Sequence, residues 1–392
     1  MKVIYIASVF DDECLKKKFD GKPVLLYAAS KYNTLLFEGI VQNGVETNVL
    51  SVVPINRTCY KKVFFKGYKL MKDKLKVSYL SQINLPILKN FGNLFSGFFG
   101  TLFAPKNSVI IYDVLVVSAS MGALLAAKLR RFKKVGIVTD LPRFQGVSES
   151  AIMLKMNNKV VDAADGYVFL TRQMNEEVNT KGKPYLVLEG HVDVNMQMQE
   201  HKPFETDTKI VVYAGAIENV YGIGMLCDAF LQVAKPCEVL HIYGSGSYEK
   251  ELSEIAAENE NIVYHGNRPN YEVVETELSA TLLVNPRPTT GEFTKFSFPS
   301  KTLEYMVSGT PVLSARLAGI PEEYENYIFY FDENTAESLG SKIREILDLS
   351  AEELAERGAS ARRFALEEKN NVAQAAKIVE FSRELQNKRK KK

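Results

Sequence analysis

Residues 298–312 decide the fold of this chain and read FPSKTLEYMVSGTPV. They predict a short helix that carries one carboxylate, Glu304, stops at Gly309 and leads directly into a strand. Pro299 suits the first helical turn, where its missing N–H costs nothing. The free N–H groups of that turn and the ammonium of Lys301 attract an anion, while Glu304 can accept hydrogen bonds from hydroxyls. This layout suits the diphosphate and the ribose of a nucleotide.

Four further motifs lie upstream, and each places a glycine or a polar residue just after an expected strand. They are YAGAIENVYG at 213–222 with Gly215 and Gly222, IYGSGS at 242–247 with Gly244, YHGN at 264–267 with Asn267, and VNPRP at 284–288 with Arg287. A glycine after a strand often only permits a tight turn, so each motif alone is weak. Their combination with Lys301 and Glu304 is specific.

Together these motifs resemble the donor-sugar half of retaining glycosyltransferases of the GT-B fold, in particular glycosyltransferase family 4. The resemblance implies two doubly wound, parallel-sheet, Rossmann-like α/β domains with an interdomain cleft. It also implies a hexosyl transfer with retention, from a nucleotide-diphosphate sugar and without a metal or another cofactor. The donor-binding residues that it assigns are Gly215, Gly222, Gly244, Asn267, Arg287, Ser300, Lys301 and Glu304.

The chain also departs from that family at three positions. A glutamate that usually touches the donor sugar is replaced by Phe296, and two diphosphate-binding cations are replaced by Ala216 and Tyr221. Our hypothesis is that Arg287 and Lys301 supply the missing charge. The departures leave open a catalytically silent homologue that binds a partner protein, and a nucleotide-sugar epimerase or a phosphorylase remains a further alternative.

The alternation of short β-rich runs with helical patterns predicts two βαβ series. We expect an acceptor-binding domain over 1–196, a polar linker at about 195–208 and a nucleotide-sugar-binding domain over 205–365. The resemblance suggests that a helix over 366–387 packs back on the first domain. A basic tail, 388–392, follows.

Asp140 is the candidate catalytic residue of the first domain, because it follows the strand expected at 135–139. A carboxylate there could accept the proton of an acceptor hydroxyl. The equally plausible structural role is a cap on the turn that follows. The four cysteines form no CxxC pair and show no metal spacing with the four histidines, so we expect no metal site and a reducing compartment.

Charge is distributed unevenly along the chain. Residues 1–200 carry 27 Lys and Arg against 17 Asp and Glu, whereas the remainder carries 22 against 30. A lysine-rich run and the phenylalanine-rich stretch 85–103 lie within 57–103. The helix expected in the phenylalanine-rich stretch either faces the core or lies on a membrane, and the lysine-rich run can bind an anionic surface. Segment 57–103 is therefore the candidate for peripheral membrane contact. The tail 388–392 is either solvated or adds to that attraction.

The chain has no charged n-region and apolar h-region of a signal peptide at Met1–Ala7, and a pI near 8.1 accompanies no nucleic-acid-reading motif. We therefore expect a cytoplasmic protein, at the inner face of the plasma membrane if the membrane contact is made, and no nucleic-acid partner. The expected acceptor is a saccharide or a lipid-linked saccharide in cell-surface polysaccharide or glycolipid assembly.

Overall fold

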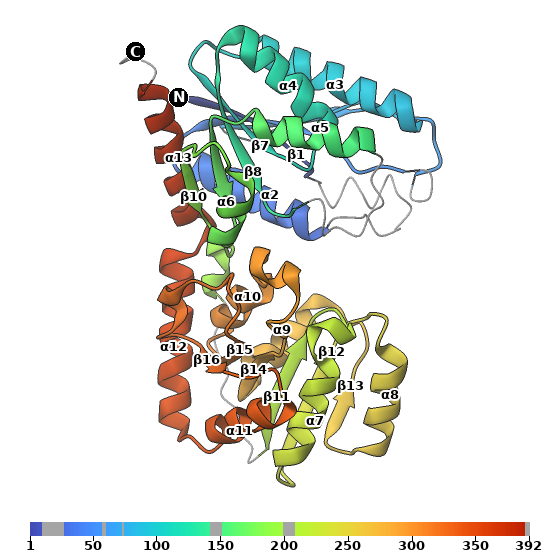
Figure 1. The fold of residues 1–392 in the computed structure, drawn as a ribbon, viewed down its shortest axis with the longest axis vertical. Helices are drawn as coiled ribbons and strands as arrows, with labels where there is room; N and C mark the ends of the chain where they lie inside the picture. Colours follow the sequence, from blue (N-terminus) through green and yellow to red (C-terminus); the bar gives the residue numbers. More distant parts are fainter. Residues whose placement is uncertain (10–26, 57–59, 73, 142–150, 199–207, 389–392) are drawn as a thin grey trace. The chain divides into compact units, whose positions relative to one another are not determined.

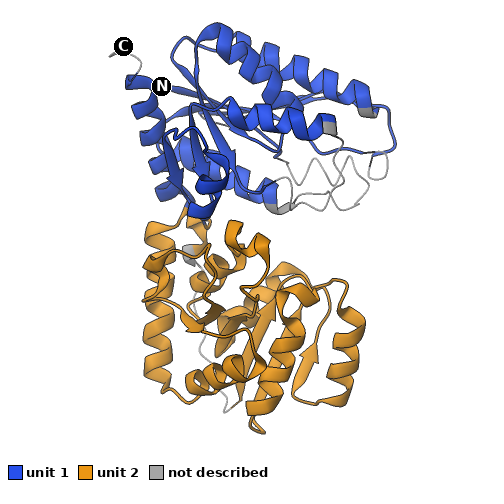
Figure 2. Ribbon diagram, in the orientation of Figure 1, with its two compact units in different colours: residues 1–191, 371–392 blue, residues 192–370 orange. Residues whose placement is uncertain are grey.

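The computed structural model describes residues 1–9, 27–56, 60–72, 74–141, 151–198 and 208–388. The chain divides into two compact units (Figure 1, Figure 2). Unit 1 comprises Met1–His191 and Asn371–Lys392, and unit 2 comprises Val192–Asn370. Unit 2 is thus a continuous segment inserted into the sequence of unit 1. The two ends of this segment meet, because Val192 pairs with Asn370 in an isolated parallel bridge.

Unit 2 is built on a six-stranded sheet in which every pairing is parallel. In spatial order its strands are β13 (Ile262–Tyr264), β12 (Glu238–Tyr243), β11 (Lys209–Ala214), β14 (Leu282–Asn285), β15 (Val312–Ala315) and β16 (Phe329–Phe331). The strand order reverses between β11 and β14. Open parallel sheets bind ligands outside the carboxyl ends of their strands at such a switch point.

Both faces of this sheet are covered by helices, as a parallel sheet requires. Val211 and Tyr213 of β11 pack into one hydrophobic cluster, and Ile210 and Val212 pack into another. The covering helices are α7 (Ile223–Val233), α8 (Glu249–Glu258), α9 (Asn270–Ser279), α10 (Ser300–Ser308), α11 (Ala336–Leu347) and α12 (Ala351–Glu368). Ser350 and Glu353 form a capping box at the start of α12.

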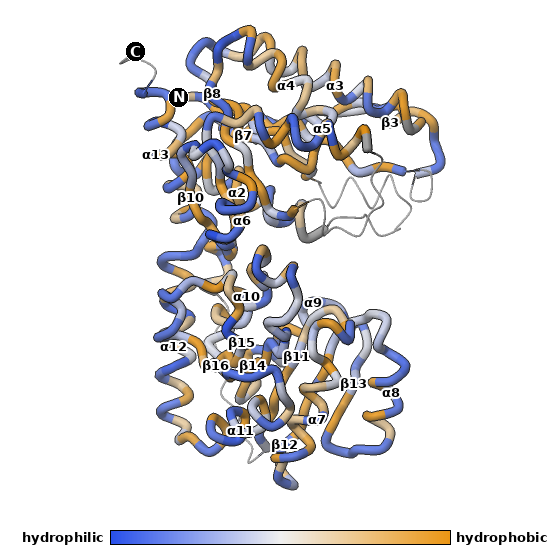
Figure 3. The backbone as a smooth tube through the Cα atoms, viewed as in Figure 1, coloured by the Kyte–Doolittle hydropathy of each residue, from blue (hydrophilic) through white to orange (hydrophobic). Residues whose placement is uncertain are grey.

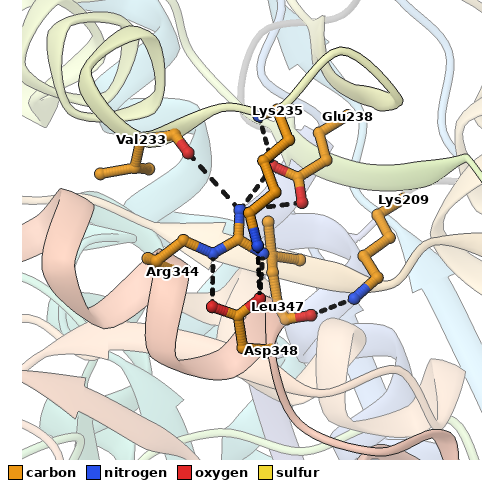
Figure 4. Close-up of polar contacts among 7 residues, drawn as sticks. All are labelled: Lys209, Val233, Lys235, Glu238, Arg344, Leu347 and Asp348. Carbon is orange, nitrogen blue, oxygen red and sulfur yellow. Dashed lines mark hydrogen bonds and ion pairs between the residues drawn. The ribbon is translucent and has the colours of Figure 1, made fainter.

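The amino edge of the same sheet is closed by an ionic network around Arg344 of α11 (Figure 4). Its guanidinium donates to both carboxylate oxygens of Glu238, at 2.9 and 2.8 Å, and to both oxygens of Asp348, at 2.9 and 2.8 Å. Lys235 also donates to Asp348 at 2.8 Å, and Lys209 donates to the carbonyl oxygen of Leu347. The network fastens the end of α11 to the starts of β11 and β12.

Unit 1 contains an eight-stranded sheet that is parallel except at one edge. In spatial order its strands are β10 (Tyr185–Val187), β9 (Gly166–Phe169), β8 (Lys133–Val138), β7 (Ser108–Asp113), β1 (Lys2–Ala7), β2 (Glu46–Ser51), β5 (Leu75–Tyr79) and β4 (Tyr68–Lys72). β4 runs antiparallel to β5, and a small ladder joins β3 (Phe64–Phe65) to β6 (Gln82–Ile83). These four short strands, β3 to β6, lie in the lysine-rich run and just after it, where the sequence analysis predicted no strand.

The helices of unit 1 are α2 (Tyr27–Gln42), α3 (Pro86–Leu102), α4 (Val117–Arg130), α5 (Ala151–Asp162), α6 (Arg172–Val178) and α13 (Asn371–Asn387). Helices α3, α4 and α5 pack in a row, and α2 packs against α13. Ile378, Phe381 and Leu385 of α13 belong to the same hydrophobic core as Val3 and Tyr5 of β1. The core of unit 1 therefore needs both of its sequence segments.

The predicted fold class is confirmed by the two parallel sheets and their covering helices. The helix expected over 366–387 corresponds to α13, which begins at Asn371, because α12 continues to Glu368. Most of the expected linker, 199–207, and the tail 389–392 lie outside the described residues. Among the described residues, no helix is long and apolar enough to cross a membrane.

Candidate functional site

Helix α10 is fixed at the carboxyl end of β11 by one buried tyrosine. The Tyr305 hydroxyl accepts a hydrogen bond from the Ala214 N–H at 2.8 Å and donates to the Ala214 carbonyl oxygen at 3.1 Å. Ala214 is the last residue of β11, so Tyr305 holds α10 beside the switch point. Pro299 is the residue before the helix rather than part of its first turn, which corrects the sequence prediction.

The first turn of α10 leaves hydrogen-bond donors open. The Thr302 N–H bonds to the Pro299 carbonyl oxygen at 2.9 Å. The N–H groups of Ser300 and Lys301 bond to no acceptor within the described part of the chain. Such N–H groups carry the positive end of the helix dipole and bind anions readily.

The ammonium of Lys301 lies between two carboxylates. It is 3.0 Å from Glu304 Oε2 and 3.4 Å from Glu277 Oε1, and Glu277 is almost fully buried. Desolvation lowers the pKa of Lys301, but the charges of Glu304 and Glu277 outweigh it and the net shift is upward. Lys301 therefore stays protonated, and its charge is already balanced by its neighbours.

Arg287, two residues after β14, has the opposite surroundings. Its guanidinium lies 4.5 Å from the ring centre of Tyr221 and 5.8 Å from that of Phe293, and it donates to Ser297 Oγ at 3.2 Å. It forms no ion pair with any described residue, and its buried Nε has no hydrogen-bond partner among them. Desolvation lowers the pKa of Arg287, with Tyr221 and Tyr213 opposing the shift, yet a guanidinium stays charged.

The predicted glycines bring three loops together at this edge. Gly244 has φ +135°, and a Cβ there would lie 1.8 Å from the carbonyl oxygen of Gly215. Gly222 has φ +82°, and a Cβ there would lie 2.4 Å from the carbonyl oxygen of Pro286. Any other residue at Gly222 or Gly244 would push the loops apart. Gly222 in particular keeps the Tyr221 loop against the Arg287 loop.

Asn267 lies in the exposed loop after β13, and no contact joins it to Arg287 or α10 among the described residues. Beside it, His265 stacks on Tyr243 with ring centres 4.3 Å apart and shares a 3.0 Å hydrogen bond with His241. Desolvation, followed by the neighbouring His265, lowers the pKa of His241 to about 4. The loop is thus supported by a neutral aromatic stack.

Asp140 belongs to unit 1, two residues after β8. Its carboxylate reaches solvent but has lost part of its hydration, and this desolvation, followed by the charge of Asp113, raises its pKa to about 6. Asp113 itself is buried at the end of β7, where it accepts hydrogen bonds from the Leu115 N–H and from Asn33 Nδ2. Asp140 therefore has a pKa suited to proton transfer near neutrality.

Comparison with known proteins identifies the architecture. Sucrose-phosphate synthase from Thermosynechococcus elongatus matches 98% of this chain and 99% of its own, with a TM-score of 0.66 at 15% identity. Anabaena HepE in complex with UDP matches 97% and 99%, with a TM-score of 0.64 at 13% identity. The lipopolysaccharide outer core galactosyltransferase WaaB matches 96% and 97%, with a TM-score of 0.60 at 15% identity. No curated protein sequence matches the chain.

Residues 208–349 match the family model described as Glycosyl transferases group 1. This chain has the GT-B fold of glycosyltransferases. The matched region is the part of unit 2 that holds every residue to which the motifs assigned donor binding. The resemblance to GT-B glycosyltransferases that the motifs indicated is therefore confirmed.

The sequence alone did not identify the residues that position the charges of this GT-B protein. Tyr221 was interpreted only as a missing cation, yet it supports Arg287. Glu277, which pairs with Lys301, and Tyr305, which fixes α10, were not predicted. Of these, only Tyr305 could have been found from the sequence. It adjoins Glu304, and a polar aromatic residue on the expected buried side of a short helix indicates a buried hydroxyl that needs a hydrogen-bond partner. No group of three or more His, Cys, Asp or Glu suited to a metal ion occurs among the described residues.

Proposed function

We propose that this chain is a glycosyltransferase that binds a nucleoside diphosphate sugar at the carboxyl edge of the unit 2 sheet. The observation that carries the proposal is Arg287, a cation without a carboxylate partner among the described residues. It follows β14, and α10 is fastened to the neighbouring strand β11. A diphosphate at the switch point would meet the guanidinium and the open N–H groups of Ser300 and Lys301.

These groups suit the chemistry of sugar transfer. Negative charge grows on the leaving diphosphate as its bond to the sugar breaks, and fixed N–H donors and cations stabilise that charge. Glu304 would accept hydrogen bonds from the ribose hydroxyls once Lys301 turns toward phosphate. Binding both substrates in a fixed orientation supplies the rest of the rate enhancement. Retention of the anomeric configuration rests on the family resemblance.

A uridine nucleotide is the donor that we propose to test first. HepE has this fold and was solved with UDP and with UDP-glucose. For the acceptor we propose a saccharide or a lipid-linked saccharide in cell-surface polysaccharide or glycolipid assembly, at the cytoplasmic face of the membrane. WaaB, named as a lipopolysaccharide galactosyltransferase, shares the fold and supports this class of acceptor.

Asp140 is our proposed acceptor-side group. If it accepts the proton of the acceptor hydroxyl, transfer should fall as the pH drops below about 6, because the carboxylate becomes protonated. Asp140→Asn should lose most transfer while still binding the donor in unit 2. Full transfer by this variant would leave Asp140 with a structural role.

The test of the donor site is thermal unfolding with UDP, GDP, ADP and their glucose conjugates. A ligand at 100 times its Kd stabilises a protein by about 2.7 kcal/mol. We expect one nucleoside diphosphate to raise Tm in the wild type and to lose this effect in Glu304→Ala. Glu356→Ala, an exposed carboxylate of α12, is the matched control. Product configuration is then read from the anomeric proton coupling.

The second candidate function is a catalytically silent homologue that binds a partner protein. Ala216 and Tyr221 favour it, because both stand where the family places diphosphate-binding cations. This candidate predicts no Tm shift with any nucleotide and no change in Glu304→Ala. The same unfolding experiment therefore decides between the two functions.

A further inference from the structure

Helix α3 of unit 1 buries small and polar residues and exposes most of its phenylalanines. Its buried side carries Asn93, Gly97 and Thr101, which recur every four residues. The buried Asn93 Oδ1 and Thr101 hydroxyl have no hydrogen-bond partner among the described residues. A helix that merely covers a sheet would bury its phenylalanines and expose these polar groups.

The small residues explain how α3 packs on α4. A Cβ at Gly97 would lie 2.1 Å from the Ala119 carbonyl oxygen, and a Cβ at Gly122 would lie 1.9 Å from the Leu94 carbonyl oxygen. The two backbones therefore touch, and neither glycine can carry a side chain. Close packing of unit 1 thus accounts for the small, buried side of α3 but leaves its aromatic side without a role.

The aromatic side of α3 faces solvent. Phe91, Phe95, Phe99 and Phe103 recur every four residues and are 53 to 80% exposed. Figure 3 colours many positions of α3 and α4 as hydrophobic. We define the α3–α4 face by its exposed apolar side chains, which are Ile87, Phe91, Phe95, Phe99, Phe103, Leu125 and Leu129. Exposed apolar surfaces of this kind mark interaction sites.

The segment that contains α3 and α4 is basic. Residues 86–131 carry five Lys and Arg and one acid, the buried Asp113. The helices run in the same direction, because Ser118 bonds to Asn90 and Arg130 bonds to the Ala104 carbonyl oxygen. Their carboxyl ends thus gather exposed cations, which are Lys106, Lys128, Arg130 and Arg131.

A cavity of about 370 Å³ lies beside these ends, and basic residues line it without any acidic one among the described residues. Lys106, Arg131 and Lys133 supply its charge. A recess of this composition is suited to phosphate groups. Lys106 of this cavity follows Phe103, the exposed residue after α3, by three residues in the sequence.

We propose that the α3–α4 face docks on an anionic lipid bilayer. The phenyl rings enter the boundary between head groups and acyl chains, and the basic rim contacts anionic head groups. A symmetric contact with a second copy of the chain would place the basic rim against itself, where like charges oppose docking. An anionic bilayer complements both features at once. This inference does not depend on the donor site.

The test uses the absence of tryptophan from the chain. Phe95→Trp places a single reporter on the α3–α4 face, and Tyr271→Trp places one on an exposed site of unit 2 as the matched control. Each full-length variant is titrated with vesicles of phosphatidylcholine alone or with added phosphatidylglycerol, without nucleotide. We expect the tryptophan emission of the Phe95→Trp variant to move to shorter wavelength with the anionic vesicles only.

Two substitutions sharpen the expected result. Phe99→Ser should weaken vesicle binding about tenfold, because one aromatic ring that enters the bilayer on docking is lost. Lys128→Glu should weaken it by at least about fivefold, and high salt should abolish this difference. Thermal unfolding confirms that both variants fold, as these side chains are exposed.

Three results would overturn the inference. One is an unchanged Phe95→Trp emission with every vesicle, and another is equal binding to neutral and anionic vesicles. The third is a concentration-dependent dimer in sedimentation that Phe99→Ser dissociates, with no vesicle binding, which would assign the face to a second copy. Loss of nucleotide binding would bear on the proposed function and leave this result unaffected.

Discussion

Two arginines lie at opposite edges of the unit 2 sheet and have opposite electrostatic environments. Arg344, at the amino edge, is held by both oxygens of Glu238 and both oxygens of Asp348 (Figure 4). Arg287, at the carboxyl edge, is supported by the rings of Tyr221 and Phe293 instead. A carboxylate neutralises a guanidinium, whereas an aromatic ring holds it in place without cancelling its charge. The first arrangement serves the fold, and the second keeps a cation available for an anion.

The largest effect should follow from removing Arg344. Arg344→Met leaves the buried Glu238 carboxylate without its cation, so we expect the free energy of unfolding to fall by about 3 kcal/mol. Urea denaturation measures the change. The double variant Arg344→Met, Glu238→Gln should recover part of the lost free energy of unfolding, because it no longer buries an unpaired carboxylate. A loss below about 0.5 kcal/mol would show that the network contributes little to stability.

Removing Arg287 should give a smaller effect, and on binding rather than on stability. Arg287→Ala should weaken binding of the nucleoside diphosphate by about 2 kcal/mol, roughly 30-fold in Kd, because charge-assisted hydrogen bonds are lost. The free energy of unfolding should change by less than about 1 kcal/mol. Calorimetric titration measures the first quantity and urea denaturation the second. Arg383→Ala, at an exposed site of α13, is the control. Unchanged affinity would end the proposed role of Arg287.

Tyr221 tests whether the ring positions the arginine. Tyr221→Leu should weaken donor binding by about 1 kcal/mol, near fivefold, because the cation–π contact is lost. Tyr221→Phe should restore the wild-type Kd, since its ring suffices. If both variants bind equally weakly, the hydroxyl acts in some other way. If both bind as the wild type does, Arg287 needs no aromatic support.

The smallest effect concerns the exposed side of the Arg344 network. Hydrogen bonds from Lys235 first, and then from Arg344, lower the pKa of Asp348 to about 2 from its ordinary value near 4. A depressed pKa means that the carboxylate stabilises the fold above about pH 4 and loses this effect as the pH falls toward 2. The stability difference between the wild type and Asp348→Asn should therefore shrink over that interval. A constant difference from about pH 5 to about pH 2 would contradict the assigned cause.

The sequence predicted the local structure around the proposed donor site because that structure depends on local rules. Lys301 and Glu304 lie on one short helix, and Gly222 has a positive φ. Both features are indicated by residues that are close together in the sequence. The role of Tyr221 could not be predicted in this way. It depends on the loop after β14, and only the pairing of β11 with β14 brings that loop near.

The basic stretch of unit 1 shows the same limit. The sequence did not predict strands β4 and β5. β4 is an edge strand, where charged side chains are tolerated, and the lysines of this stretch hide the apolar alternation of both strands. For α3 the sequence left core and membrane packing open, since periodicity locates an apolar stripe but not the side that is buried. The contacts of Gly97 and Gly122 between α3 and α4 show which side of α3 is buried, and no local pattern discloses such a contact.

The insertion of unit 2 into unit 1 also sets an order of assembly during synthesis. Chains are made from the amino terminus at about 5–20 residues per second, and domains fold as units. Unit 2 has its whole sequence as soon as Asn370 has emerged, whereas unit 1 still lacks the Ile378, Phe381 and Leu385 side chains of its core. The unit encoded first is therefore completed last. Until α13 is made, the apolar side chains of α2 that pack against it lack this part of the core.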